Sequence, residues 1–129
     1  MDVFVYGTLT DPATAASVLE TYTYRGPATL AGLHRVDGRY PTLAPGGTTD
    51  GRLLRTPDVA ALDAYEGVDR DLYVRVSPPR ADTADGRVEC YVGDPAALDA
   101  PVEWPGTGPF ADRVGRVCRR EDVGVRVRE

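Results

Sequence analysis

Glycine and proline recur through this chain at intervals too short for long helices. The 129 residues include 14 glycines and 11 prolines, and both residue types end helices and strands or form turns. Between them lie short runs in which apolar and polar residues alternate, as they do in half-buried strands. The spacing therefore predicts short strands separated by turns, at Gly26-Pro27, Asp37-Gly38, Pro45-Gly46-Gly47, Asp50-Gly51 and Pro78-Pro79.

Two stretches favour helices. Asp11 and Pro12 are typical of an N-cap and a first helical residue, and they predict a helix that continues over residues 13–20. A second helix is predicted over residues 57–66, with Gly67 as the residue that ends it. Outside the turn-rich segment 37–56, strands are predicted over residues 2–6, 21–36 in two pieces, 72–79, 87–93 and 122–129. A polar turn is predicted over 81–86, and a loop with one helical turn over 94–113.

The order of these elements indicates the fold class. The predicted strands do not alternate regularly with helices, which disfavours a doubly wound parallel sheet. We expect an α+β fold in which a mixed sheet or small β-barrel carries short flanking helices. The length of 129 residues predicts a single domain over residues 1–129.

The charge of the chain limits the classes of molecule that we expect it to bind. The net charge is −5, all 15 basic residues are arginine, and 14 of the 20 acidic residues are aspartate. A negative chain disfavours nucleic acid, because phosphate binding needs clustered cations. The lysine-free, aspartate-rich balance fits a surface adapted to high salt (a halophilic protein), a drift toward GC-rich codons, or both.

Neither a membrane nor a metal is expected. No window approaches 18 consecutive apolar residues, and the first residues lack the pattern of a signal peptide, so we expect a cytoplasmic protein without a membrane span. Cys90 and Cys118 stand outside any C-x-x-C motif, and free thiols are expected, with one disulfide left open. A single histidine and no zinc-type spacing predict no metal site. The sequence does not set the oligomeric state.

The segment "VFVYGTLT", residues 3–10, ends a strand on a glycine turn. Glycine at position 7 lets the chain turn sharply and lets a ligand approach the backbone. Successive amides exposed in such a turn can bind an anion. The alternative is that Gly7 only permits a bend.

Glu66 is the second candidate, because it stands at the end of the second predicted helix, before Gly67. A carboxylate at the negative end of a helix has a raised pKa. A glutamate with a raised pKa suits proton transfer near neutral pH. The alternative is a solvated helix-end residue that pairs with Arg75. For Arg75 itself a surface ion pair with Asp71 or Asp69 is expected, with binding of a carboxylate as its alternative.

Together, "VFVYGTL" and "LDAYEGVDRDLYVR", residues 62–75, resemble the γ-glutamylcyclotransferase-like superfamily, which includes γ-glutamylcyclotransferase, γ-glutamylaminecyclotransferase and the AIG2-like proteins. The segments "DGRYPTLAPGG", "DGRLLRTPD" and "VECYVG" extend the resemblance to residues 2–93. Leu54 and Gly93 depart from it, because relatives usually carry aromatic residues there. These departures concern the side of the pocket that would receive the leaving group.

The resemblance implies a fold, a site and a reaction. The fold is a small mixed β-barrel with flanking helices. The backbone amides of Tyr6, Gly7, Thr8 and Leu9 would bind the α-carboxylate of a γ-glutamyl substrate, and Glu66 would be the catalytic acid and base. Cyclisation would release 5-oxoproline and a free amine or amino acid, with no cofactor.

Two further tyrosines are candidates for the substrate pocket. Tyr40 and Tyr73 are assigned to its lining, with ordinary packing as the alternative for each. A second interpretation of the whole chain is a non-catalytic binding or regulatory module that keeps the pocket for a small anionic metabolite. Release of 5-oxoproline would distinguish the enzyme from the binding module.

Overall fold

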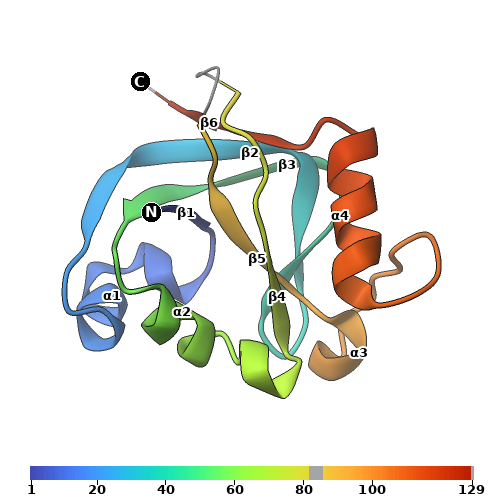
Figure 1. Cartoon of the computed structure of the whole chain (residues 1–129), viewed down its shortest axis with the longest axis horizontal. Coiled ribbons are helices and arrows are strands. Elements are labelled where there is room, and N and C mark those ends of the chain that lie inside the picture. The colour runs from blue at the N-terminus through green and yellow to red at the C-terminus, as the bar shows by residue number, and fades with distance from the viewer. Residues whose placement is uncertain (82–85, 129) are drawn as a thin grey trace.

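The computed structural model describes residues 1–81 and 86–128. Six strands form one mixed sheet in the order β4-β5-β1-β3-β2-β6, in which β1 and β5 are parallel and the other neighbours antiparallel. Within the described residues, four α-helices and two 3-10 turns flank this sheet (Figure 1). The strands are β1 (Asp2–Val5), β2 (Thr23–Asp37), β3 (Pro41–Arg55), β4 (Tyr73–Val76), β5 (Glu89–Gly93) and β6 (Gly124–Val127). The helices are α1 (Pro12–Val18), α2 (Val59–Tyr65), α3 (Pro95–Leu98) and α4 (Phe110–Arg120), and the 3-10 turns are η1 (Thr8–Thr10) and η2 (Val68–Arg70).

The expected short strands between residues 21 and 56 are wrong. Strands β2 and β3 form one long hairpin, paired from Thr23↔Arg55 to Asp37↔Pro41. Of the expected turns in this region, Asp37-Gly38 alone leads into the connection between the two strands. Gly46 and Gly47 have φ of 100° and 73° and lie beside a shift in the strand register. Their positive φ therefore makes an irregularity that bends the hairpin, where the sequence suggested a turn.

The two edges of the sheet meet at one point. The chain beyond β4 forms an isolated bridge to β6 between Arg80 and Val125. There the Ala81 N–H donates to the Val125 carbonyl at 2.8 Å, and the Val125 N–H donates to the Pro79 carbonyl at 3.1 Å. The predicted α+β class with a mixed sheet is confirmed. The expected barrel would need a continuous ladder of hydrogen bonds between the two edges of the sheet, and the structure has an isolated bridge there. The predicted polar turn over 81–86 lies mostly outside the described residues.

Helix α4 was not predicted, because residues 110–120 follow a Pro- and Gly-rich segment and carry a glycine and two valines. Val114 and Val117 are buried on the face that packs against the sheet. Arg119 and Arg120 lie in the last turn, where positive charge favours the helix dipole. Packing of one apolar stripe therefore outweighs the modest intrinsic propensity of this segment.

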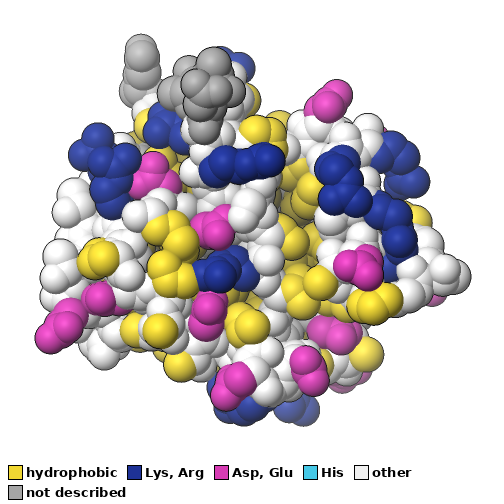
Figure 2. Space-filling model, viewed as in Figure 1, with side chains coloured by type: hydrophobic (Ala, Val, Ile, Leu, Met, Phe, Trp, Pro, Cys, Tyr) yellow, Lys and Arg dark blue, Asp and Glu magenta, His cyan; other side chains and the backbone are white. Residues whose placement is uncertain are grey.

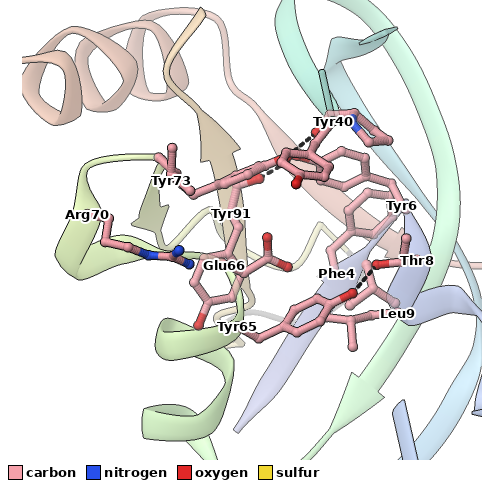
Figure 3. Close-up of a pocket in the computed structure, with 14 residues that line it drawn as sticks. Phe4, Tyr6, Thr8, Leu9, Tyr40, Tyr65, Glu66, Arg70, Tyr73 and Tyr91 are labelled. Carbon is pink, nitrogen blue, oxygen red and sulfur yellow. Dashed lines mark hydrogen bonds between the residues drawn. The ribbon is translucent and has the colours of Figure 1, made fainter. Parts of the chain in front are cut away.

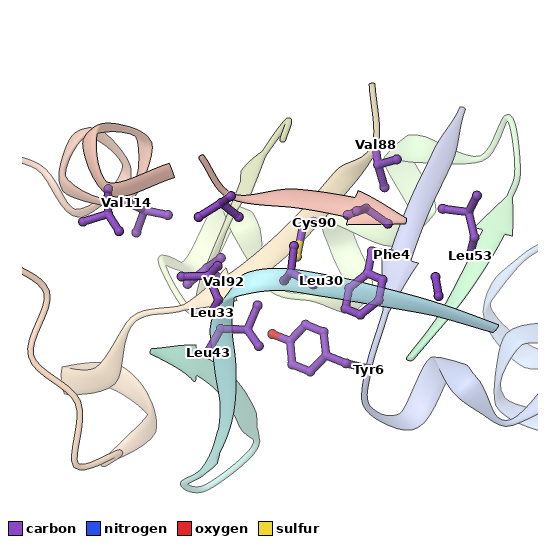
Figure 4. Close-up of a cluster of buried hydrophobic side chains, with 14 of the residues drawn as sticks. Phe4, Tyr6, Leu30, Leu33, Leu43, Leu53, Val88, Cys90, Val92 and Val114 are labelled. Atoms are coloured by element: carbon purple, nitrogen blue, oxygen red, sulfur yellow. The ribbon is translucent and has the colours of Figure 1, made fainter. Parts of the chain in front are cut away.

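Strand β1 is central and buried on both faces. Phe4 and Tyr6 join the larger apolar cluster, whose side chains fill the space between the strands and α4 (Figure 4). Val3 and Val5 point the other way, into a second cluster that α1 and α2 cover. The alternation of side chains along a strand accounts for this division. It anchors the residues that lead directly into the loop after β1.

Both cysteines are free. Cys90 is buried in the larger cluster and Cys118 is partly buried. None of the helices within the described residues is long and apolar enough to cross a membrane. Figure 2 shows that basic side chains gather over α4, while arginine and acidic side chains are interspersed on the rest of the face it presents.

Candidate active site

A cavity of about 320 Å³ opens beside the C-terminal end of β1. Four segments that are distant in the sequence form its walls (Figure 3). They are β1 with the loop after it, the Tyr40–Pro41 turn, the end of α2 with the segment that follows, and Tyr91 on β5. The cavity brings together all seven residues that the sequence assigned to a site: Tyr6, Gly7, Thr8, Leu9, Tyr40, Glu66 and Tyr73.

The loop after β1 has free backbone donors. Residues Thr8–Thr10 form the 3-10 turn η1, in which the N–H groups of Thr10 and Asp11 donate to the carbonyls of Gly7 and Thr8 at 3.1 Å. No hydrogen bond among the described residues uses the N–H of Gly7, Thr8 or Leu9, as expected for the first donors of such a turn. Three successive unpaired N–H groups therefore belong to a loop that lines the cavity.

Tyr6 holds the end of β1 in place. Its side chain is buried, and its hydroxyl donates to the carbonyl of Tyr91 at 2.6 Å. The carbonyl of Tyr6 in turn accepts a hydrogen bond of 2.9 Å from Arg35. Burial raises the pKa of the Tyr6 hydroxyl well above its usual range, so it stays a neutral donor. The side chain of Tyr6 therefore supports the loop from the core.

Tyr65 links α2 to the same loop, and sequence reasoning missed it. Its hydroxyl and that of Thr8 share a hydrogen bond of 2.6 Å across the cavity (Figure 3). Only its position next to Glu66 in the sequence could have pointed to it. The contact sets the distance between the free N–H groups of the loop and the end of α2.

Glu66 follows the last residue of α2, as the sequence predicted. Its N–H donates to the carbonyl of Leu62 at 2.9 Å, and Gly67 ends the helix with a φ of +68°. The Glu66 side chain points into the cavity (Figure 3). Its carboxylate accepts no hydrogen bond and forms no ion pair with any described residue.

Burial raises the pKa of Glu66 to about 7. The sequence also predicted a raised pKa, but from the end of the helix; the physical cause in the structure is the loss of water around the carboxylate. The predicted alternative, a pair between Glu66 and Arg75, is wrong. Arg75 instead forms ion pairs with Asp63 (Nη1 to Oδ1, 3.6 Å) and Glu89 (Nε to Oε1, 3.8 Å). The expected pair of Arg75 with Asp69 or Asp71 is therefore also wrong.

Tyr73 and Tyr40 line the opposite wall. The buried Tyr73 hydroxyl donates to the carbonyl of Pro41 at 2.5 Å, and this contact fixes the turn between β2 and β3. Tyr40 is 53% exposed and lies at the rim. Burial raises the pKa of Tyr73 well above its usual range. Tyr73 therefore holds this wall of the cavity in place, and the ring of Tyr40 lies exposed at the entrance of the cavity.

Contacts of Asp63 connect the elements that surround Glu66. Tyr91 lines the cavity, and its hydroxyl donates to Asp63 at 2.6 Å, next to the contact between Asp63 and Arg75. This network ties α2 to β4 and β5. Arg70, on η2, also lines the cavity, and sequence reasoning did not single it out. No group of three or more His, Cys, Asp or Glu in residues 1–81 and 86–128 is placed to hold a metal ion.

The chain belongs to the AIG2-like gamma-glutamyl cyclotransferase family, because the model of that family matches residues 3–105. The search of curated proteins gives no match. Seven solved chains, in contrast, are similar to the structure.

Three solved structures illustrate the shared fold. One described as a gamma-glutamyl cyclotransferase has a TM-score of 0.65 at 13% identity, over 93% of this chain and 79% of that one. A protein of Arabidopsis thaliana has a TM-score of 0.54 at 29% identity, over 93% and 74%. An uncharacterized protein from Homo sapiens has a TM-score of 0.63 at 16% identity; the match covers 72% of this chain and 66% of the human one, just under two thirds.

Because the pKa of Glu66 is raised, we expect the free energy of unfolding to depend on pH. A carboxyl group whose pKa is higher in the folded state than in the unfolded state destabilises the fold as it ionises. Between pH 4.5 and about 7, wild type should therefore lose stability relative to Glu66→Gln. At about 1.36 kcal/mol per pKa unit, the loss has an upper limit of about 3 kcal/mol.

Urea unfolding of both proteins at pH 4 and pH 8.5 would measure this difference. We expect similar free energies of unfolding at pH 4 and a more stable Glu66→Gln at pH 8.5. Glu20→Gln, which changes an exposed carboxylate outside the cavity, is the control and should follow wild type. A constant difference between Glu66→Gln and wild type across this range would show that Glu66 does not lose its hydration on folding.

Proposed function

We propose that this protein is a γ-glutamyl cyclotransferase, which releases 5-oxoproline and a free amine or amino acid from a γ-glutamyl substrate. One observation carries the proposal: the Glu66 carboxylate, unpaired and with a pKa raised to about 7, points into a cavity that the loop after β1 also lines. Membership of the family supports it. The assignment of roles to individual residues is part of the proposal.

The reaction needs an oriented substrate and the transfer of two protons from the α-nitrogen to the leaving nitrogen. The α-amine of the γ-glutamyl group attacks its own γ-carbonyl carbon, the new N–C bond closes a five-membered ring, and the bond to the leaving nitrogen breaks. Because the attack is intramolecular, holding the substrate in a folded conformation supplies much of the rate. The N–H groups of Gly7, Thr8 and Leu9 would hold the α-carboxylate, and Tyr40 and Tyr73 would confine the chain.

The pKa of Glu66 suits the proton transfer. At neutral pH an α-amine is protonated and cannot attack; its pKa is about 8. A glutamate of ordinary pKa, about 4.3, would take that proton at a cost of about 5 kcal/mol, whereas one with a pKa near 7 needs only about 1.4 kcal/mol. The ring nitrogen still carries one proton too many after the attack. Glu66 would donate its proton to the departing nitrogen, return to its ionised state and take this second proton from the ring nitrogen; the second proton then leaves with the free amine as part of an ammonium group.

Product analysis tests the proposal. Wild-type protein should release 5-oxoproline from at least one member of a panel of γ-glutamyl dipeptides and γ-glutamyl amines. The panel should be run at low and high salt, because the lysine-free acidic composition fits a protein that works in high salt. Binding of a panel member without release at either salt would contradict the proposal and favour the non-catalytic binding module.

A further inference from the structure

The side chain of Arg70 brings a positive charge to the cavity. Arg70 ends the 3-10 turn η2, which follows α2. Among the described residues that line the cavity, only Arg70 and Glu66 carry charge. In Figure 3 the side chain of Arg70 reaches from this turn toward the cavity, on the side where Glu66 points inward. The cavity thus holds one positive and one negative side chain.

The guanidinium of Arg70 has no partner within residues 1–81 and 86–128. No described hydrogen bond or ion pair involves it. The other arginines around the site are occupied: Arg35 donates to the Tyr6 carbonyl, and Arg52 donates to the Thr10 carbonyl and lies over the ring of Tyr24. Arg70 is therefore the arginine here whose donors remain available to a ligand.

Arg70 is not held by Glu66 either. A paired arginine would favour the ionised carboxylate and lower the pKa of Glu66, but burial raises it instead. The two groups therefore present separate charges to a bound molecule. A guanidinium offers parallel N–H donors that match the two oxygens of a carboxylate.

The two classes of γ-glutamyl substrate differ in one charge. Both carry the α-carboxylate of the γ-glutamyl group, for which the loop after β1 supplies three free N–H donors. A γ-glutamyl amino acid carries a second carboxylate on its leaving half, whereas a γ-glutamyl amine carries none. A cavity of about 320 Å³ is at the small end of ligand pockets, which suits a dipeptide-sized molecule.

We infer that Arg70 binds the carboxylate of the leaving amino acid, and that it makes γ-glutamyl amino acids, in preference to γ-glutamyl amines, the substrate class of this site. The inference rests on the proposed function. It assigns Arg70 a role in specificity and leaves the proton transfer to Glu66.

A matched pair of substrates tests it. γ-Glutamylalanine and γ-glutamylalaninamide differ only in the leaving group's carboxylate, which the amide replaces by a neutral group. Wild type should show a kcat/KM at least about tenfold higher for the acid, as expected for one charge-assisted hydrogen-bonded contact. Arg70→Gln should lose this preference by lowering kcat/KM for the acid, with little change for the amide.

The control variant is Arg126→Gln. Arg126 is an exposed arginine on β6 that does not line the cavity, so its replacement makes the same charge change and should keep the preference. If Arg70→Gln lowers kcat/KM equally for both substrates, or if the preference for the acid survives, the inference is wrong while the proposed function stands.

Binding separates the inference from the reaction. Affinities of the acid and the amide are measured by calorimetry in Glu66→Gln, with and without Arg70→Gln. A preference for the acid that disappears with Arg70→Gln supports the inference even if wild type releases no 5-oxoproline and the proposed function fails. Equal affinities for the two compounds in Glu66→Gln overturn it.

Discussion

Glu66→Gln is expected to lower kcat for 5-oxoproline release by about 10³-fold, within the range that a positioned acid and base contributes. Glutamine keeps the size and polarity of the side chain but cannot take a proton from the substrate ammonium. Because the Glu66 carboxylate makes no hydrogen bond to any described residue, no internal contact is lost in the variant. Steady-state kinetics on the best substrate of the panel, with calorimetric affinity alongside, would measure the effect.

The control is Asp69→Asn, which neutralises an exposed carboxylate three residues away that does not line the cavity. It should retain the activity of wild type. Turnover by Glu66→Gln at the wild-type rate would refute the assignment of the acid and base. A folded Glu66→Gln that no longer binds substrate would instead assign Glu66 to recognition of the substrate amine.

Gly51→Ala is expected to destabilise the protein by about 3 kcal/mol, the upper part of the usual range for overpacking. Gly51 lies within β3, and a Cβ added there would be 2.2 Å from the carbonyl oxygen of Val5 and 2.8 Å from the ring of Phe4. The first obstacle is backbone of β1, which cannot move without disturbing the strand that leads into the cavity loop. Urea unfolding followed by circular dichroism would measure the free energy.

Gly115→Ala is the matched control, since it makes the same chemical change in the middle of α4. There the added Cβ meets only the flexible end of Arg119, at 3.3 Å. Alanine favours a helix over glycine by about 1 kcal/mol, so this variant should be more stable than wild type. A Gly51→Ala variant as stable as wild type would mean that β1 and β3 can separate at little cost.

Local chemistry accounts for the features that the sequence predicted well. The Asp11 side chain accepts a hydrogen bond from the Ala13 N–H and caps α1, with Pro12 at its first position. Gly67 ends α2 in the left-handed conformation that glycine favours. Such contacts involve residues a few positions apart, so the sequence is sufficient to predict them.

Predictions failed where the outcome depended on a distant strand or sheet. Pro45-Gly46-Gly47 has the composition of a turn, yet it lies within β3 because β2 pairs with the residues on both sides of it. Helix α4 forms where its valines meet the sheet. In both cases long-range packing outweighs local preference.

The candidate site shows the same division. Motifs near positions 7 and 66 identified the loop and the glutamate, because each motif is a short contiguous pattern. The low hydration of Glu66, the hydrogen bond between Thr8 and Tyr65 and the unpaired guanidinium of Arg70 arise only when separate segments enclose one cavity. Burial and pairing are properties of everything that surrounds a group in space, and residues adjacent in the chain supply only part of those surroundings.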